Sequence, residues 1–413
     1  MKHFYTACCF FICLVNVCFS QDSLYARKVI NTLCAPGFHG RGYVNDGDAK
    51  AAAFISAEFK KSGLQPVDSL YEQTFQFPVN TFPGKMKVCV EGKPLNPGAD
   101  YIVYPASAGA KKTFHTTVVD SLTMMAQLSA FGNTCLVIEM KDFNAQKEAA
   151  IALLKKKQTG AVILMEEKKL TWGVAQYHFT VPVIVILKSK FPANTHRIKF
   201  NSKSIFIESH QAQNIVAMVK GITNPDSFIV FSAHYDHLGR MGRGTYFPGA
   251  NDNASGVSML LNLAKHYSLE INKPKYSMVF IAFAGEEAGL AGSKYFIEHP
   301  LVDLKKIRFL INLDLVGTGD EGMMVVNATE HKREFEQLKK INEDRQYLTH
   351  IGERGKSKNS DHYYFSENGV PAFFFYTMGG IQAYHDIYDK AETLPLTKYK
   401  EVFRLIRDFA DSL

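Results

Sequence analysis

The chain has 413 residues, of which 46% are hydrophobic and 21% are charged, and its formal net charge is +7. This composition is typical of an ordinary globular protein, and the length suggests two folding units. The lysines form short clusters, such as residues 155–157 and 168–169, that interrupt apolar segments. The pattern therefore favours a solvated face over a surface that binds nucleic acid.

Residues 1–20 are interpreted as a secretory signal peptide. An apolar stretch from Phe4 to Phe19 is followed by a cut after Ser20, with small residues at positions −3 and −1. A lipoprotein signal anchored at Cys18 is the weaker alternative, because Val17 is larger than the residue usual before such a cysteine. We therefore expect a secreted or periplasmic protein. No later run reaches the roughly 20 apolar residues of a membrane span.

The mature chain keeps three of the seven cysteines, namely Cys34, Cys89 and Cys135. They permit at most one disulfide and have no Cys-x-x-Cys spacing. A metal site in this chain must therefore be built from imidazole and carboxylate groups.

The first part of the mature chain is expected to begin a larger domain. Residues 26–63 have a helical pattern, and residues 71–79 alternate like a strand. A turn-rich break follows at residues 94–98.

A smaller domain is expected after this break. Its predicted elements are short apolar strands around one helix: strands at 135–138, 161–164 and 181–186, and a helix at 145–157. Residues 214–217 return the chain to the first sheet. We therefore expect residues 21–94 and 211–413 to form one domain, with a smaller α/β or β-rich domain of residues 95–210 inserted.

Four later apolar runs each lead into a residue that can bind a metal. They are residues 228–231 before His234, 278–283 before Glu286 and Glu287, 309–311 before Asp314, and 372–376 before the loop with His385. Runs of this kind are typical of buried strands, and open α/β sheets build their sites at the carboxyl ends of such strands. The runs therefore predict one shared site.

A fifth candidate, Asp252, lies in a Gly/Asn-rich loop that opens a helix, which Asn253 or Ser255 can cap. The adjacent carboxylates Glu286 and Glu287 directly follow a strand, where their burial is costly unless a cation compensates. Imidazole and carboxylate groups in this order suit two adjacent zinc ions.

Taken together, these strings resemble the co-catalytic two-zinc aminopeptidase family, which includes secreted bacterial leucine-type aminopeptidases. The resemblance implies an α/β fold with a mixed, mostly parallel central sheet flanked by helices in a three-layer sandwich. Residues 95–210 resemble a protease-associated domain, a module often inserted into these peptidases.

The resemblance also implies a ligand set for two zinc ions per chain. Asp252 corresponds to the carboxylate that bridges the ions. His234 and Asp314 complete one zinc site, and Glu287 and His385 complete the other.

Glu286 corresponds to the general base of the family, which takes a proton from a hydroxide between the metals. Asp236 corresponds to the carboxylate that holds the imidazole of His234, and metal-bound histidines usually have such a partner. Asp389 is a weaker candidate for the same part beside His385.

Two further assignments stay open between alternatives. Tyr384 corresponds to a catalytic tyrosine that hydrogen-bonds the tetrahedral intermediate, but an aromatic ring packed under the site fits equally well. His362, in the string Ser360-Asp361-His362, competes with His385 as a ligand. We favour His385, because the Tyr-His pair followed by Asp389 matches the family more closely.

The expected function is removal of N-terminal residues from peptides with a free N-terminus. The sequence has no His-Glu-x-x-His, no Gly-x-Ser-x-Gly and no phosphate-binding loop. A glutaminyl-cyclase-like acyltransferase with one zinc is a second hypothesis, although residues 251–256 follow the peptidase pattern. A binding or receptor protein on an inactive scaffold is a third, but all five ligands and the base are present. The preferred N-terminal residue, the oligomeric state and the metal used in the cell stay open.

Overall fold

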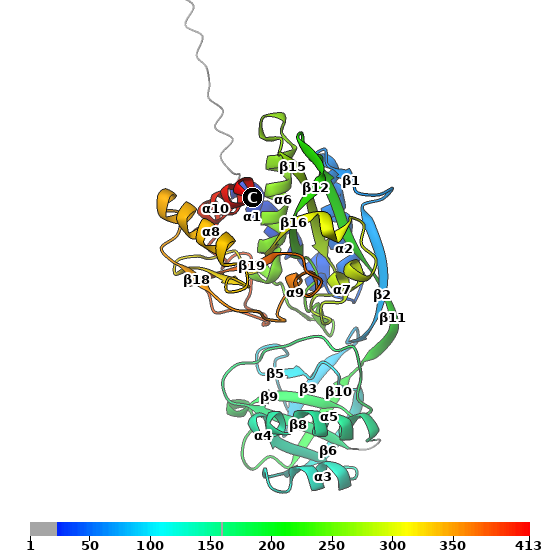
Figure 1. Ribbon diagram of the computed structural model, residues 1–413. Helices are drawn as coiled ribbons and strands as arrows, with labels where there is room; N and C mark the ends of the chain where they lie inside the picture. Colours follow the sequence, from blue (N-terminus) through cyan, green and yellow to red (C-terminus); the bar gives the residue numbers. More distant parts are fainter. Residues whose placement is uncertain (1–22, 158–159) are drawn as a thin grey trace, which may run out of the picture.

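The structure is a computed structural model that describes residues 23–157 and 160–413, so the predicted signal peptide lies outside it. The chain forms two bodies, one above the other in Figure 1, each built around its own sheet. Among the described residues, no helix combines the length and the apolar character that crossing a membrane would require.

The larger body contains a mixed sheet. Its strands, in spatial order, are β1 (Gln65–Pro66), β11 (Ile205–Val219), β15 (Tyr276–Phe283), β12 (Asn224–His234), β16 (Ile307–Leu313), β19 (Ala372–Met378), β17 (Gly322–Val326) and β18 (Ile351–Glu353), and β2 (Glu72–Thr81) pairs with β11. The central strands β15, β12, β16 and β19 are parallel neighbours, whereas β11 and β17 join antiparallel. The predicted mixed, mostly parallel sheet is confirmed.

Helices cover both faces of this sheet, because its central strands are apolar on both sides. In β15, Phe280 and Ala282 join one buried cluster while Val279 and Ile281 join the cluster on the opposite face. The first cluster includes residues of α1 (Ser23–Leu33), α2 (Gly47–Lys61), α6 (Gly256–Ser268), α8 (Lys332–Arg345) and α10 (Tyr399–Ser412), and the second includes residues of α7 (Ala291–Glu298) and α9 (His362–Glu367). The result is the predicted three-layer arrangement.

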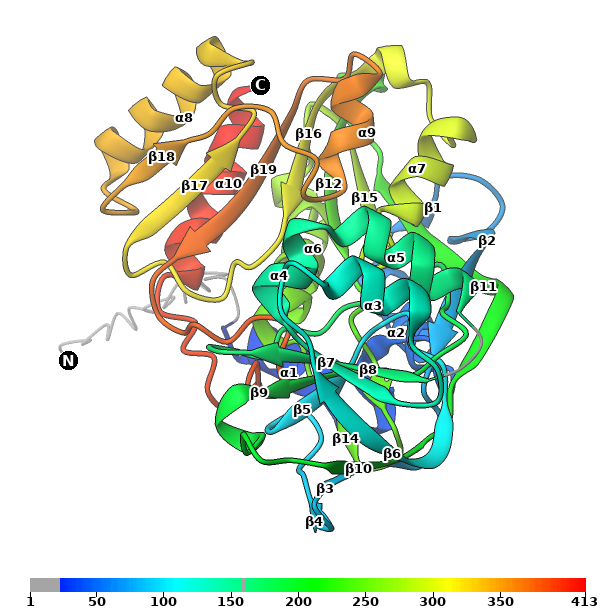
Figure 2. The same cartoon turned by 90° about the horizontal axis from the view of Figure 1, so that it is seen from below.

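The smaller body is formed by the chain between β2 and β11. Its sheet has the order β4 (Lys93–Pro94), β3 (Met86–Val90), β10 (Arg197–Ser202), β6 (Ala110–Val118), β7 (Cys135–Glu139), β8 (Ala161–Glu166), β9 (Val183–Leu187) and β5 (Tyr101–Val103). Figure 2 shows its helices α3 (Met124–Ala130), α4 (Met140–Ala145) and α5 (Lys147–Lys156) from below. Cys34, Cys89 and Cys135 are all buried and unbridged.

The sheet of the smaller body begins earlier in the chain than the boundary at residue 95 that the sequence suggested. Strand β3 pairs with β10, more than a hundred residues later in the chain, and β4 pairs with β3. The turn-rich break at 94–98 therefore lies inside the smaller body and does not mark its boundary. The sequence did not reveal this, because a local pattern does not show that a strand pairs with a segment so far along the chain. The long antiparallel strands β2 and β11 then run from one body to the other (Figure 1).

Short elements complete the described chain. They are the hairpin of β13 (Arg240–Met241) and β14 (Thr245–Tyr246), and the helical turns η1 (Pro36–Arg41), η2 (Lys188–Lys190), η3 (Ala250–Ser255), η4 (Glu270–Asn272) and η5 (Leu304–Lys306). In η3, the side-chain oxygen of Asn253 accepts the N–H of Gly256 at 2.9 Å. Asn253 thus accepts the first N–H of α6, whereas Ser255, the residue directly before the helix, makes no capping hydrogen bond with its side chain.

A fully buried arginine, Arg41, ties together the loops at the carboxyl edge of the larger sheet. Its guanidinium group donates to five main-chain carbonyl groups, those of Leu33, Tyr235, Pro248, Gly249 and Asp252. The carbonyl of Tyr235 directly follows β12, and three others lie in the segment 248–252 that precedes α6. A single cation therefore fixes two loops of the edge relative to each other.

Replacing Arg41 with methionine should lower the free energy of unfolding by about 3 kcal/mol or more, because several buried carbonyl groups lose their donor. Urea unfolding monitored by circular dichroism measures the change. The control is Arg333→Met on α8, whose side chain is 89% exposed, and which should shift stability by no more than about 0.5 kcal/mol. Equal effects of the two substitutions would contradict the role given to Arg41.

Candidate metal centre

Adjacent strands bring the candidate ligands to one edge of the larger sheet. His234 is the last residue of β12, and Asp314 directly follows β16. Glu286 and Glu287 follow β15, and His385 lies in the loop after β19. Because β15, β12, β16 and β19 are parallel neighbours, their carboxyl ends meet, and the side chains that follow them converge.

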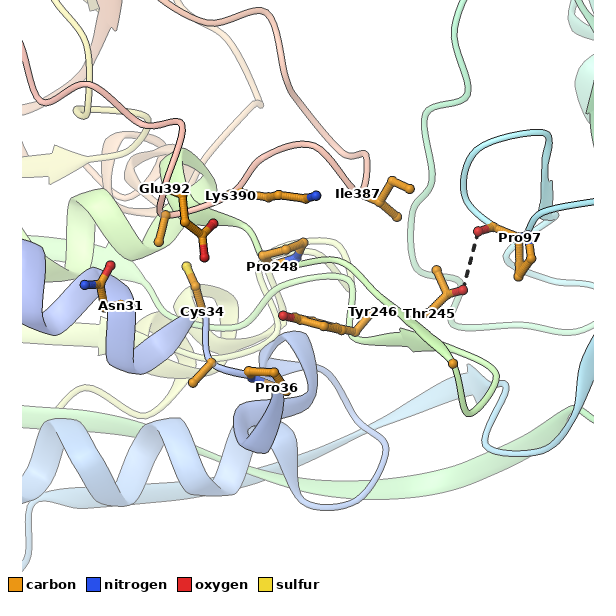
Figure 3. A pocket seen from close by; sticks show the side chains of 13 residues that line it. Asn31, Cys34, Pro36, Pro97, Thr245, Tyr246, Pro248, Ile387, Lys390 and Glu392 are labelled. Atoms are coloured by element: carbon orange, nitrogen blue, oxygen red, sulfur yellow. Dashed lines mark hydrogen bonds between the residues drawn. The ribbon is translucent and has the colours of Figure 1, made fainter.

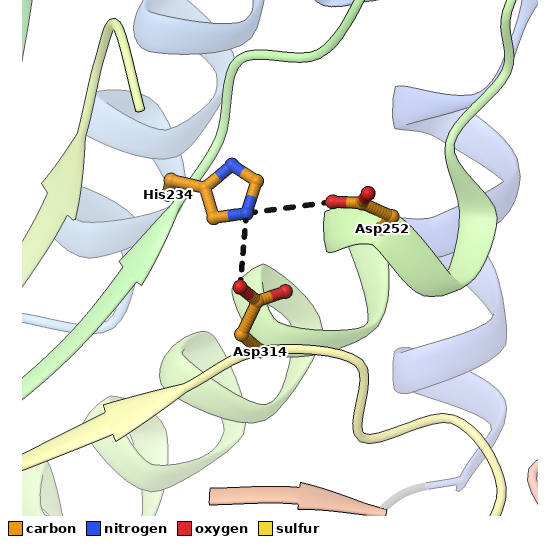
Figure 4. A group of neighbouring side chains, drawn as sticks. All are labelled: His234, Asp252 and Asp314. Carbon is orange, nitrogen blue, oxygen red and sulfur yellow. Dashed lines mark ion pairs between the residues drawn. The ribbon is translucent and has the colours of Figure 1, made fainter. Parts of the chain in front are cut away.

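The first cluster consists of His234, Asp252 and Asp314, drawn in Figure 4. The Nε2 atom of His234 lies 3.4 Å from Oδ1 of Asp252 and 3.3 Å from Oδ2 of Asp314. Ligand atoms that share a tetrahedral zinc, each about 2.0–2.1 Å from it, lie roughly 3.3 Å apart. The spacing of this buried cluster therefore fits a metal ion, and Oδ1 of Asp314 is buried without a hydrogen-bond partner in the described chain.

A second cluster shares Asp252 with the first. The Nε2 atom of His385 lies 3.0 Å from Oδ2 of Asp252 and 3.4 Å from Oε2 of Glu287. Asp252 thus turns one carboxylate oxygen toward each cluster. A carboxylate in this position is able to bridge two cations.

His237 is a residue of the site that the sequence analysis missed. Its Nδ1 atom lies 2.8 Å from Oε1 of Glu287 and 3.9 Å from Oδ1 of Asp252, and the side chain is fully buried. These three residues also have the spacing of a metal site. The sequence signal that could have revealed it is its position directly after His234-Tyr235-Asp236. Because His237 and His385 both contact Asp252 and Glu287, they compete as the histidine ligand of the second cluster.

Asp236 supports the site in a different way from the one the sequence suggested. Its carboxylate accepts the N–H groups of Glu286 and Glu287 at 3.1 and 3.2 Å, and the hydroxyl of Tyr43 at 2.6 Å. The ring of His234 instead contacts the main-chain carbonyl of Asp236, 3.2 Å from Nδ1, whereas the nearest carboxylate oxygen is 3.9 Å away. The carboxylate therefore holds the turn with the two glutamates.

The suggestion that Asp389 holds the ring of His385 was wrong. The buried carboxylate of Asp389 accepts the N–H groups of Asn251 and Asp252 at 2.8 and 3.0 Å, so it fixes the main chain of the bridging loop. The Nδ1 atom of His385 contacts the carbonyl of Trp172 in the smaller body.

His362, the competing ligand, lies at the start of α9, where its buried ring packs 5.3 Å from that of Phe374. It is a member of neither cluster formed by the described residues. Burial lowers the pKa of His362 to about 4. The structure places His385, rather than His362, beside Asp252.

The site concentrates negative charge in a region with little water. Burial, together with the nearby Glu287, raises the pKa of Glu286 well above its ordinary value, against the effect of His234. Burial also raises the pKa of Asp314. Carboxylates crowded in this way are costly without compensating cations.

A cleft of about 590 Å³ opens onto the two clusters, and Glu286, Arg354, Lys358 and Tyr384 also line it. The ring of Tyr384 stacks on that of His385 with 4.0 Å between centroids, and the residue is 44% exposed. Tyr384 is thus accessible from the cleft, where a substrate would lie.

A second cavity of about 680 Å³ lies near the turn that follows α1 (Figure 3). It is lined by Cys34, Tyr246, Ile387, Lys390 and Glu392 among others, and by none of the candidate ligands. Lacking any cluster of imidazole and carboxylate groups, it offers none of the chemistry of the first cleft.

Solved structures have the same fold as this chain. The structure of BSAP, a zinc aminopeptidase from Bacillus subtilis, superimposes with a TM-score of 0.72 at 19% identity and covers 94% of both chains. An aminopeptidase from Aneurinibacillus sp. strain AM-1 has a TM-score of 0.67 at 21% identity and covers 95% of this chain and 93% of its own. The predicted zinc-aminopeptidase fold is therefore confirmed.

Sequence comparison gives a consistent result. The chain is 28% identical to aminopeptidase YwaD of Bacillus subtilis (strain 168) over 349 residues, which are 78% of this chain and 70% of the relative. A probable zinc metalloprotease of Pyricularia oryzae is 37% identical over 113 residues, 26% of this chain and only 22% of the relative. Residues 214–410, which contain every candidate ligand, match the sequence profile of peptidase family M28. Over these residues, slightly less than half of the chain, the protein is therefore similar to peptidase family M28.

Proposed function

We propose that the chain is a secreted zinc-dependent aminopeptidase that binds two zinc ions. The observation that carries this proposal is the position of Asp252, which turns one oxygen toward His234 and the other toward His385. Both sequence relatives named above and the solved structures with this fold are peptidases by name. Secretion rests on the signal peptide expected at residues 1–20.

The ligands of one ion would be His234, Asp252 and Asp314, and those of the other Asp252, Glu287 and His385, with His237 as the alternative to His385. The chemistry that zinc supplies in such a site is polarisation of a peptide carbonyl and activation of water. All these donors are imidazole nitrogens and carboxylate oxygens, which zinc accepts.

Glu286 is the residue that we propose as the general base. Its side chain lines the same cleft as the ligands, and its main chain is held by Asp236, yet it is a member of neither cluster. In the proposed reaction its carboxylate takes a proton from the attacking water and delivers it to the leaving amine. Tyr384, which stacks on His385, would donate a hydrogen bond to the oxygen of the substrate carbonyl.

Peptides with a free N-terminus should be cleaved, whereas the same peptides with an acetylated N-terminus should resist. Acetylation removes the free amine, which one of the two metal ions would hold. Hydrolysis of matched free and acetylated aminoacyl anilides, with and without a chelator, measures the difference, and metal analysis of the active protein should give about two zinc ions per chain. Equal cleavage of both substrates would refute the exopeptidase assignment, and full activity with one zinc would favour the cyclase-like alternative.

Identical substitutions at adjacent positions separate the base from the ligand. Glu286→Gln should retain zinc but lose about 10²–10⁴-fold in kcat, because an amide cannot accept the proton. Glu287→Gln should lose zinc as well as activity, because a carboxylate ligand is removed. Zinc content and turnover, measured on the same preparations, check both expectations. If Glu286→Gln loses the zinc and Glu287→Gln keeps it, the two roles are exchanged.

A second matched pair decides which histidine binds the second ion. We expect His385→Gln to leave about one zinc per chain, because its Nε2 lies beside both Asp252 and Glu287. We expect His237→Gln to keep both ions, because the Nδ1 of His237 is engaged by Glu287. Zinc analysis after dialysis gives the answer, and the opposite result would make His237 the ligand.

A further inference from the structure

A loop of the smaller body reaches the metal centre of the larger one. This loop, residues 169–176, lies between β8 and β9 and is called the clamp loop below. It contacts both segments that supply ligands to the second ion. Lys169 and Trp172 contact the segment around His385, and Gln176 donates to the carbonyl of Ala288, next to Glu287.

Two hydrogen bonds in opposite directions join Trp172 to His385. The N–H of Trp172 donates to the main-chain carbonyl of His385 at 2.9 Å. The Nδ1 atom of His385 lies 3.0 Å from the carbonyl oxygen of Trp172. A carbonyl oxygen only accepts, so Nδ1 must carry the proton, and in the neutral ring the lone pair lies on Nε2, which faces Asp252 and Glu287.

The side chain of Trp172 anchors this residue to both bodies. Its indole N–H donates to the carbonyl of Val103 in β5 at 2.8 Å. The indole ring stacks on Phe247 of the larger body, with 4.5 Å between ring centroids, and the residue is only 5% exposed. The carbonyl that meets His385 therefore has little freedom to move.

Lys169 holds the other side of the same segment. Its Nζ atom lies 2.7 Å from Oδ2 of Asp386, and it also donates to the carbonyls of Gln382 and Tyr384 at 3.0 and 3.1 Å. The carboxylate of Asp386 is only 6% exposed, so this ion pair is shielded from water on one side. One lysine thus gathers three acceptors around His385.

We propose that the clamp loop positions His385 for the second metal ion, so that the inserted body is a working part of the metal centre. The inference rests on the proposed two-zinc function. Trp172 and Lys169 are positioning residues: they act on the ring and the main chain of His385, and neither lines the cleft that opens onto the clusters. Partners that fix the tautomer and orientation of a ligand typically change metal affinity about 10- to 100-fold.

Trp172 is the single tryptophan of the chain, so its fluorescence reports on the clamp loop. Zinc added to the metal-free, full-length protein should change the tryptophan emission during the binding step that His385→Gln removes. Emission that stays constant while both ions bind would count against the proposal.

Neighbouring lysines provide a matched pair of variants. Lys169→Met should weaken the second zinc by about 10-fold or more in a competition titration with a chromogenic chelator, while the first zinc binds as before. Lys168→Met should bind both ions like the natural chain, because within the described residues Lys168 forms a hydrogen bond only through its main-chain N–H, to the Glu166 carboxylate. Lys169→Arg keeps the positive charge beside Asp386 and should restore most of the affinity. This variant still tests the ion pair if Lys169→Met does not fold.

The outcomes separate the inference from the function on which it rests. If Lys169→Met and Trp172→Ala both bind two zinc ions with natural affinity, the clamp is refuted while the aminopeptidase stands. If the natural chain binds one zinc, or if His237 rather than His385 proves to be the ligand, the proposed ligand set fails first.

Discussion

Buried carboxylates that meet at one edge of the larger sheet are the constraint on which the site depends. Asp252, Asp314, Glu286 and Glu287 come from three separate segments and line one cleft. The accompanying histidines offset part of this charge, yet burial still raises the pKa of Glu286. Groups of like charge with little access to water need cations between them. The same crowding that makes this edge of the sheet unfavourable without cations therefore suits it to hold metal ions.

Holding these side chains close requires a rigid main chain, and buried charged residues provide it. Asp236 accepts two N–H groups of the glutamate turn, and Asp389 accepts two of the bridging loop. Arg41 donates to carbonyls of the bridging loop and of the loop that follows β12. All three satisfy buried main-chain groups, so the loops that carry Asp252 and Glu287 are held by the protein itself.

The smaller body takes part in this support. Its sheet is separate from that of the larger body, but its buried core also includes Leu238, Met241 and Phe247 of the larger body. Its loop at residues 169–176 also meets the segments that carry His385 and Glu287. His234 contacts a carbonyl two residues away, whereas His385 contacts one that is 213 residues away. The two candidate zinc sites thus differ in how much of the fold each one requires.

The sequence alone determined the parts of this protein that local patterns encode. Apolar runs such as residues 278–283 predicted buried strands, and the polar residues that follow them predicted the edge where the ligands meet. Only the tertiary structure decided the partners. In the folded chain His237 contacts Glu287, and β3 pairs with β10. Asp389 accepts hydrogen bonds from the bridging loop and does not contact the ring of His385 as predicted. The reason is physical: a strand and the polarity of its ends follow from neighbouring residues, whereas a hydrogen-bond partner depends on how distant segments pack.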